Sequence, residues 1–182
     1  MGTFAGGHDN LSELDPRGLL VLESLSRVIF SGKYNLTPSS NPPPSLVLYD
    51  LDLKEIDRFT PRTGMVSGGQ LFYGKNTNEI IGISTSDNVL YRYNIKDRKL
   101  IDYVALGQNI GPVTQRLSDG TIWILVGSTL IKVDSSNLEL QAVGTLSAAI
   151  TMLQWLDRTL YVALADPTGT AGSQLGGISG LT

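Results

Sequence analysis

Short runs of alternating apolar and polar residues, each ending in a turn-forming residue, recur along the chain. The runs LYDLD (48–52), LYRYN (90–94) and LIKVD (130–134) begin 42 and then 40 residues apart. Alternation with a period of two is typical of β-strands, and Asp and Asn are typical of the turns that follow them. This fixed spacing predicts a repeated structural unit.

Each repeat holds three further strand-like runs. One is almost continuously apolar and rich in β-branched residues, which is typical of a strand covered on both faces (27–32, 79–84, 121–126 and 159–164). Another run precedes it, and a more polar run follows the alternating one. Turn pairs at Asp119-Gly120 and Asp87-Asn88 separate these runs, and such pairs favour tight hairpins. Four short strands in about 40–45 residues are the blade unit of a β-propeller.

The sequence therefore predicts an all-β fold, a β-propeller segment of four-stranded antiparallel blades. Complete blades are expected at 19–60, 65–104 and 112–143, with half of a fourth at 150–164. Residues 1–18 are expected to be an irregular N-terminal segment, and 165–182 a Gly-rich flexible tail or a truncated inter-strand loop. Propellers close with about four to eight blades, so we expect a segment of a longer propeller or one completed by a partner. A β-sandwich is the alternative, although a sandwich does not require a fixed repeat.

The composition excludes some classes of partner but says little about the fold. The 182 residues carry 14 Lys and Arg against 17 Asp and Glu, a net charge of −3, which argues against a nucleic-acid partner. No run approaches the ~20 apolar residues of a membrane span, so no membrane partner is expected. The N-terminus has no signal-peptide pattern. The compartment therefore stays open, with secretion an option if the sequence is truncated at its N-terminus. With no cysteine, no metal motif and no phosphate-binding loop, neither a cofactor nor a metal is expected.

The segment DGTIWIL (119–125) and the runs LYRYNIKDRKL and LIKVDSSNLEL resemble blades of YVTN, quinoprotein-dehydrogenase-like and streptogramin-lyase-like propellers. The resemblance extends over about Leu19 to Leu164, and its motifs are structural ones, so it implies the fold more than any chemistry. Streptogramin lyases use a catalytic His within the propeller. The only His in this chain is His8, which precedes the first blade.

Propeller ligands usually lie over the central channel, where loops enter the first strand of each blade. Candidate ligand-binding residues are therefore taken from these loops and from the channel side of the first strands: Arg62, Gln108, Asn109, Gln115, Gln154 and Trp155. Gln70 is expected to face the channel as well, whereas Trp123 is expected to be buried between blades.

Amides dominate this set, and no catalytic residue is identified. The sequence thus favours a non-catalytic scaffold that binds a protein or carbohydrate, with self-association through open blade ends. The alternative is a fragment of a propeller enzyme (a lyase, glycoside hydrolase or quinoprotein-like dehydrogenase) whose catalytic residues lie outside this segment.

Overall fold

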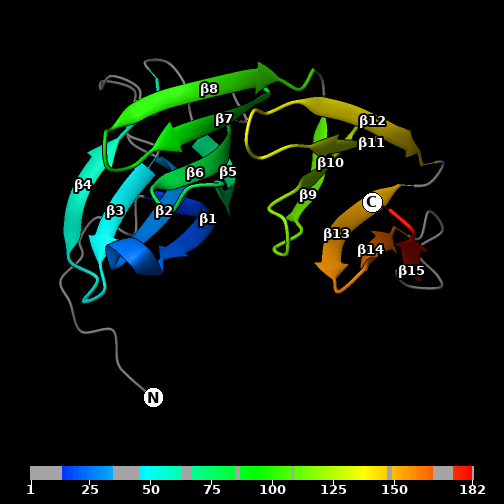
Figure 1. Cartoon of the computed structure of the whole chain (residues 1–182), viewed down its shortest axis with the longest axis horizontal. Coiled ribbons are helices and arrows are strands. Elements are labelled where there is room, and N and C mark those ends of the chain that lie inside the picture. Colours follow the sequence, from blue (N-terminus) through cyan, green and yellow to red (C-terminus); the bar gives the residue numbers. More distant parts are fainter. Residues whose placement is uncertain are drawn as a thin grey trace.

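The computed structural model describes residues 14–34, 46–62, 67–84, 87–107, 109–146, 149–165 and 174–181. Within these residues the chain forms four small antiparallel sheets, each a meander in which consecutive strands pair. Figure 1 shows the sheets arranged along an arch, with the first strand of each sheet on the inner side. This arrangement confirms the propeller segment that the repeat predicts and excludes the sandwich.

We number the sheets as blades in chain order. Blade 1 holds β1 (Leu14–Leu22), β2 (Arg27–Tyr34), β3 (Leu46–Asp50) and β4 (Glu55–Phe59), with a short 3₁₀ helix, η2 (Glu23–Leu25), after β1. Blade 2 holds β5 (Ser67–Tyr73), β6 (Glu79–Ser84), β7 (Val89–Asn94) and β8 (Lys99–Ala105). Blade 3 holds β9 (Ile110–Gln115), β10 (Ile122–Val126), β11 (Thr129–Val133) and β12 (Leu140–Thr145). Blade 4 holds β13 (Ile150–Leu156), β14 (Thr159–Leu164) and β15 (Gln174–Ser179).

The hairpins form where the sequence predicts turns. Gly120 lies between β9 and β10 with φ +78°, a left-handed conformation that glycine adopts without a steric penalty. The Asp119 carboxylate accepts a hydrogen bond from the Thr121 N–H at 3.0 Å, which fixes the same turn. Asn88 takes φ 53° directly before β7. These local interactions, rather than long-range contacts, set where the strands reverse.

In blades 2 and 3 burial is greatest in the second strand, because that strand is covered by a neighbouring blade on each side. All six residues of β6 are buried, whereas the outer strand β8 is largely exposed. Within blade 2, Gly82 lies opposite Tyr91, and the fully buried Tyr91 ring occupies the space that a side chain at Gly82 would need. The continuously apolar runs of the sequence are therefore the strands packed on both faces.

Three apolar clusters join neighbouring blades. The first packs blade 1 on blade 2, the second blade 2 on blade 3, and the third blade 3 on blade 4. Trp123 is 1% exposed and belongs to the third cluster, which confirms the prediction that it is buried between blades. Hydrophobic burial between sheets thus supplies the main cohesion of the arch.

Two boundaries differ from those expected. Residues 174–179 form the strand β15, which pairs with β14 along its length, so they are neither a flexible tail nor a truncated loop. The stretch QLGGIS has two glycines and few apolar residues, and its backbone hydrogen bonds rather than its side chains define the strand. Likewise β1 starts at Leu14 and not at Leu19, because a bulge between Pro16 and Gly18 accommodates the proline in an edge strand. None of the described residues forms a helix with the length and hydropathy needed to cross a bilayer.

Candidate functional site

The first strands of all four blades line one cavity of about 400 Å³, which we call the central cavity. β1 contributes Leu19, β5 contributes Gln70, β9 contributes Gln115 and β13 contributes Gln154. The three glutamines that sequence reasoning placed toward the channel therefore share one cavity. Its described lining holds no charged side chain.

Gln115 joins blade 3 to blade 2 through its side-chain amide. Its Oε1 accepts the Tyr73 N–H at 3.1 Å, and its Nε2 donates to the Tyr73 carbonyl at 2.8 Å and to the Gly120 carbonyl at 3.0 Å. The amide therefore pairs with the Tyr73 backbone much as a neighbouring β-strand would. Since Gln115 is also buried, it holds the cavity wall together more than it offers groups to a ligand.

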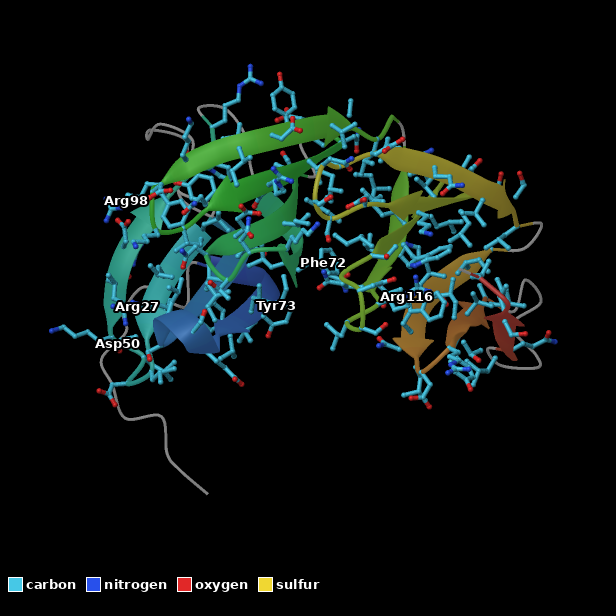
Figure 2. All side chains as sticks on the ribbon, in the orientation of Figure 1. Arg27, Asp50, Phe72, Tyr73, Arg98 and Arg116 are labelled. Atoms are coloured by element: carbon cyan, nitrogen blue, oxygen red, sulfur yellow. The ribbon has the colours of Figure 1, made fainter. Side chains whose placement is uncertain are left out.

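Tyr73, at the end of β5, is the point where three cavities meet. It lines the central cavity, a larger cavity of about 600 Å³ between the hairpins of blades 2 and 3, and a third of about 450 Å³ between blades 1 and 2. Its hydroxyl donates to the Val21 carbonyl of blade 1 at 3.1 Å. Figure 2 shows Tyr73 at the inner side of blade 2. No sequence motif marks this residue, because its role depends on neighbours from three blades.

Gln154 and Trp155 are adjacent in sequence but lie on opposite faces of β13. Gln154 is exposed and lines the central cavity, with its Nε2 donating to the Trp155 carbonyl at 3.2 Å. Trp155 is buried in the blade 3–blade 4 cluster, where its ring centroid lies 5.4 Å from that of Trp123. The Arg116 guanidinium lies over the Trp155 ring at 5.0 Å.

The candidate residues Arg62 and Asn109 lie in the loops that precede β5 and β9. They are therefore at the opposite ends of these strands from Tyr73 and Gln115. Arg62 is exposed, and its guanidinium lies 5.3 Å from the centroid of the Tyr103 ring on the outer strand β8. Asn109 adopts φ 52°, and its carbonyl accepts a hydrogen bond from the Gly127 N–H at 3.1 Å. Neither residue lines any of the three cavities above. Gln108 lies outside the described residues.

Two carboxylates, Asp119 and Asp134, line the cavity of about 600 Å³. Partial burial acts to raise the pKa of Asp119, but hydrogen bonds from Arg116 and Thr121, together with the Arg116 charge, outweigh this effect and lower the pKa to about 2. Hydrogen bonds from Ser136 lower the pKa of Asp134, and the charges of Lys75 and Lys132 add to that effect. Both carboxylates are therefore ionised at neutral pH and are poor proton donors. Among the described residues, no group of three or more potential metal ligands comes together, and His8 is not among these residues.

Comparison with known proteins identifies the fold but not a family. No family model matches the chain, and no curated protein sequence matches it.

Solved structures do match, and they are β-propellers. They include a protein of unknown function from Bacteroides caccae, at 11% identity with a TM-score of 0.63 over 92% of this chain and 64% of that one. Hydrazine synthase of Kuenenia stuttgartiensis matches at 12% identity with a TM-score of 0.61, over 98% of this chain and 49% of that one. The WD40 repeats of RRP9 match at 10% identity with a TM-score of 0.58, over 84% and 46%.

The chain thus spans less than two thirds of the length of each of these structures. At such identities the likeness carries the fold alone. The propeller fold is confirmed, whereas no finding selects the YVTN, quinoprotein-like or streptogramin-lyase-like group.

Proposed function

We propose that this chain is a non-catalytic β-propeller scaffold that binds a protein or carbohydrate ligand at its central cavity. The observation that supports this proposal is the uncharged lining of that cavity, to which all four blades contribute. General acid–base catalysis needs a titratable group within hydrogen-bonding reach of the reacting atoms, and the one titratable side chain in the described lining, Tyr73, already donates its hydroxyl to the Val21 carbonyl. Amide and apolar groups suit recognition of hydroxyl or peptide groups instead.

Gln70 and Gln154 are the two side chains best suited to contact the ligand. Both are exposed and both line the central cavity, in contrast to Gln115, whose amide already bonds to the backbone of Tyr73 and Gly120. Leu19 adds a half-exposed apolar group from blade 1. A ligand that combines hydroxyl or amide groups with an apolar face would match this combination.

The proposal is tested by titrating the ¹⁵N-labelled chain with a panel of neutral oligosaccharides and of extended peptides. We expect at least one class to shift amide signals of β5, β9 and β13 near the cavity. The Gln70→Ala and Gln154→Ala variants should weaken that binding several-fold, whereas Gln141→Ala, a matched change on the exposed outer strand β12, should leave it unchanged. Binding that maps elsewhere, or that survives both cavity substitutions unchanged, would contradict the proposal.

The scaffold also presents an open sheet face on blade 4. Because side chains alternate along a strand, Leu153, Trp155 and Leu160 face blade 3, and the intervening residues face away from it. The strand register arranges this outward face in three cross-strand rows: Met152–Ala163–Leu175, Gln154–Tyr161–Gly177 and Leu156–Thr159–Ser179. None of these residues is charged.

Apolar side chains on this face are strongly exposed. Leu156 is 61% exposed, Leu175 68% and Met152 49%. The outward face of blade 1 differs, since Val28, Val47 and Tyr49 on that blade are buried. The sequence leads us to expect open apolar faces at both ends of the arch, and among the described residues the broadly exposed face is that of blade 4.

We propose that a second copy of the chain covers the face of blade 4. An uncharged sheet face that exposes Met152, Leu156 and Leu175 can pack against its own copy without bringing like charges together. Exposed apolar side chains gathered on one face are typical of an interaction surface. The other faces of β13 and β14 already pack on blade 3 in the same sheet-to-sheet manner. The self-association can be measured by sedimentation, as described below.

A further inference from the structure

Side chains already bond to much of the backbone that faces the central cavity. The strands β1, β5, β9 and β13 are edge strands of their sheets. An edge strand offers a row of unpaired N–H and C=O groups, to which an extended peptide can add as a further strand. On three of these four strands the row is interrupted by side-chain hydrogen bonds from the same or a neighbouring blade.

Two of the interrupted edges belong to blades 1 and 2. On β1 the Val21 carbonyl accepts the Tyr73 hydroxyl of blade 2 at 3.1 Å. On β5 the Gly69 carbonyl accepts the Ser31 hydroxyl of blade 1. Further along β5, the Tyr73 N–H and carbonyl both bond to the Gln115 amide of blade 3, at 3.1 and 2.8 Å. A peptide could pair along these edges only by breaking bonds that join the blades.

The third interrupted edge is β13 of blade 4. The Trp155 N–H donates to the Thr114 hydroxyl oxygen of blade 3 at 3.4 Å, and the Trp155 carbonyl accepts the Gln154 Nε2 at 3.2 Å. Strand addition would leave these side-chain groups without their partners, which costs free energy wherever water cannot replace them. The cavity therefore favours a ligand that bonds to side chains over one that adds as a strand.

The side chains that remain for a ligand are amides. Gln70 and Gln154 are exposed and line the cavity. An amide has an acceptor oxygen and two donor hydrogens, so it can bond to two hydroxyls at once, one as donor and one as acceptor. One Gln154 hydrogen is used by the Trp155 carbonyl, and the amide keeps its oxygen and its other hydrogen. No described lining residue is charged, so a charged ligand would lose hydration there without gaining a counter-charge.

An apolar surface lies beside these amides. Tyr73 is 42% exposed and Leu117 is 76% exposed, and both line the central cavity. A sugar ring has C–H groups on its faces and hydroxyls at its edge, so it can pack on an aromatic ring and form hydrogen bonds at the same time. The Tyr73 hydroxyl donates to the Val21 carbonyl, which holds the ring in position before a ligand arrives.

We propose that the ligand of the central cavity is a neutral carbohydrate, whose ring packs on Tyr73 and Leu117 while its hydroxyls bond to Gln70 and Gln154. This inference rests on the proposed function of the cavity and narrows it to one class of ligand. The volume of about 400 Å³ lies within the range of small-molecule sites, about 300–1,000 Å³, and suits a short oligosaccharide.

The test titrates the ¹⁵N-labelled chain with cellotriose, maltotriose and mannotriose and, separately, with a soluble seven-residue peptide of alternating Thr and Val. Binding is followed by the amide shifts of β5, β9 and β13. Tyr73→Ala and Leu117→Ala remove the apolar contacts, whereas Tyr73→Phe keeps the ring and removes its hydroxyl. Tyr103→Ala is the matched control, because this tyrosine is 48% exposed but lies on the outer strand β8. The thermal midpoint establishes that each variant is folded, and Leu117→Ala keeps the test valid if Tyr73→Ala is not.

We expect at least one trisaccharide to shift these amides more strongly than the peptide does. Tyr73→Ala should weaken sugar binding at least tenfold and Leu117→Ala at least threefold. Tyr73→Phe should weaken it less than threefold and Tyr103→Ala less than twofold. Raising NaCl to 0.5 M should change the affinity less than twofold, because no ion pair forms.

Two results would overturn this inference while the proposed binding function of the cavity stands. One is a peptide that binds at these strands as tightly as any of the sugars. The other is sugar binding that both Tyr73→Ala and Leu117→Ala leave unchanged. If neither the sugars nor the peptide shift these amides at 20 mM, the proposed function and this inference both fail.

Discussion

Replacing Gln115 should loosen the junction between blades 2 and 3. Gln115→Ala removes three hydrogen bonds, at 2.8, 3.0 and 3.1 Å, that join its side chain to the backbone of Tyr73 and Gly120. A typical hydrogen bond contributes about 0.5–1.5 kcal/mol net, and water from the adjoining cavities can reach some of the groups left behind. We therefore expect a loss of about 2–4 kcal/mol in the free energy of unfolding.

Urea denaturation followed by tryptophan fluorescence measures this loss. With a slope of about 2 kcal/mol/M, the midpoint should fall by about 1–2 M. Gln154→Ala is the matched control, because this exposed glutamine makes one hydrogen bond, to its neighbour Trp155, and should change stability by less than about 0.5 kcal/mol. If Gln115→Ala unfolds at the same urea concentration as Gln154→Ala, the amide does not join the blades.

The variant Gln115→Glu tests the contribution of the hydrogen bonds while it keeps the shape of the side chain. The introduced carboxylate keeps an acceptor for the Tyr73 N–H but faces the carbonyls of Tyr73 and Gly120 without a donor. Its pKa should therefore be higher in the folded than in the unfolded state. At pH 7 this variant should be less stable than Gln115→Ala, and it should regain stability as the pH falls and the carboxylate takes up a proton. A stability difference between the two variants that does not change with pH would contradict this interpretation.

Three further substitutions test the packing and the turns. Trp123→Ala should cost about 3–5 kcal/mol, because the indole is 1% exposed between blades 3 and 4, whereas Leu51→Ala on the surface should cost less than about 0.5 kcal/mol by urea denaturation. Gly82→Ala should cost about 1–3 kcal/mol, because the added methyl group meets a buried aromatic ring, whereas Gly144→Ala, with open space around it, should be nearly neutral in the same assay. Asp119→Asn should lower the thermal midpoint at pH 6, and the difference from wild type should shrink as the pH falls from about 4 toward 2. The lowered pKa of Asp119, about 2, means that its ionised form stabilises the fold above that range. A difference that stays constant down to pH 2 would contradict the assigned ion pair.

The fold was predictable because the repeat is visible in the apolar and polar pattern of the strands. The buried strand β10 reads IWILV in the sequence, and the alternating strand β7 reads VLYRYN, so both could be identified without a structure. By contrast β15 is defined by backbone hydrogen bonds to β14, and its two glycines give no apolar signal. A strand that contributes little to a core leaves little trace in a hydrophobic pattern.

The candidate site was predictable only in part. The positions of Gln115 and Gln154 at the channel follow from their places in the first strands, and the structure places both there. The pairing of Gln115 with Tyr73, 42 residues earlier, reflects the repeat period, since equivalent positions of successive blades lie side by side. The sequence reveals this period, but it does not reveal that the Gln115 side-chain amide points toward the Tyr73 backbone.

Trp155 shows why the face of a strand is hard to assign from sequence. In β13 both alternating sets contain apolar residues, Leu153 and Trp155 in one and Met152 and Leu156 in the other. Either set could face the neighbouring blade, and only the strand register decides between them. The cavity of about 600 Å³ between the hairpins of blades 2 and 3 was missed for a related reason, because its charged residues come from two blades and share no local motif.

The open face of blade 4 is tested most directly by sedimentation equilibrium of the 182-residue chain at about 5 to 300 µM. We expect a reversible monomer–dimer equilibrium. Leu175→Lys should shift it to monomer, because the charge would be buried in the interface, whereas Leu51→Lys, at an equally exposed site on blade 1, should sediment as the wild type does. A chain that remains monomeric at 300 µM, or a dimer that tolerates Leu175→Lys unchanged, would contradict the proposed pairing of this face with a second copy.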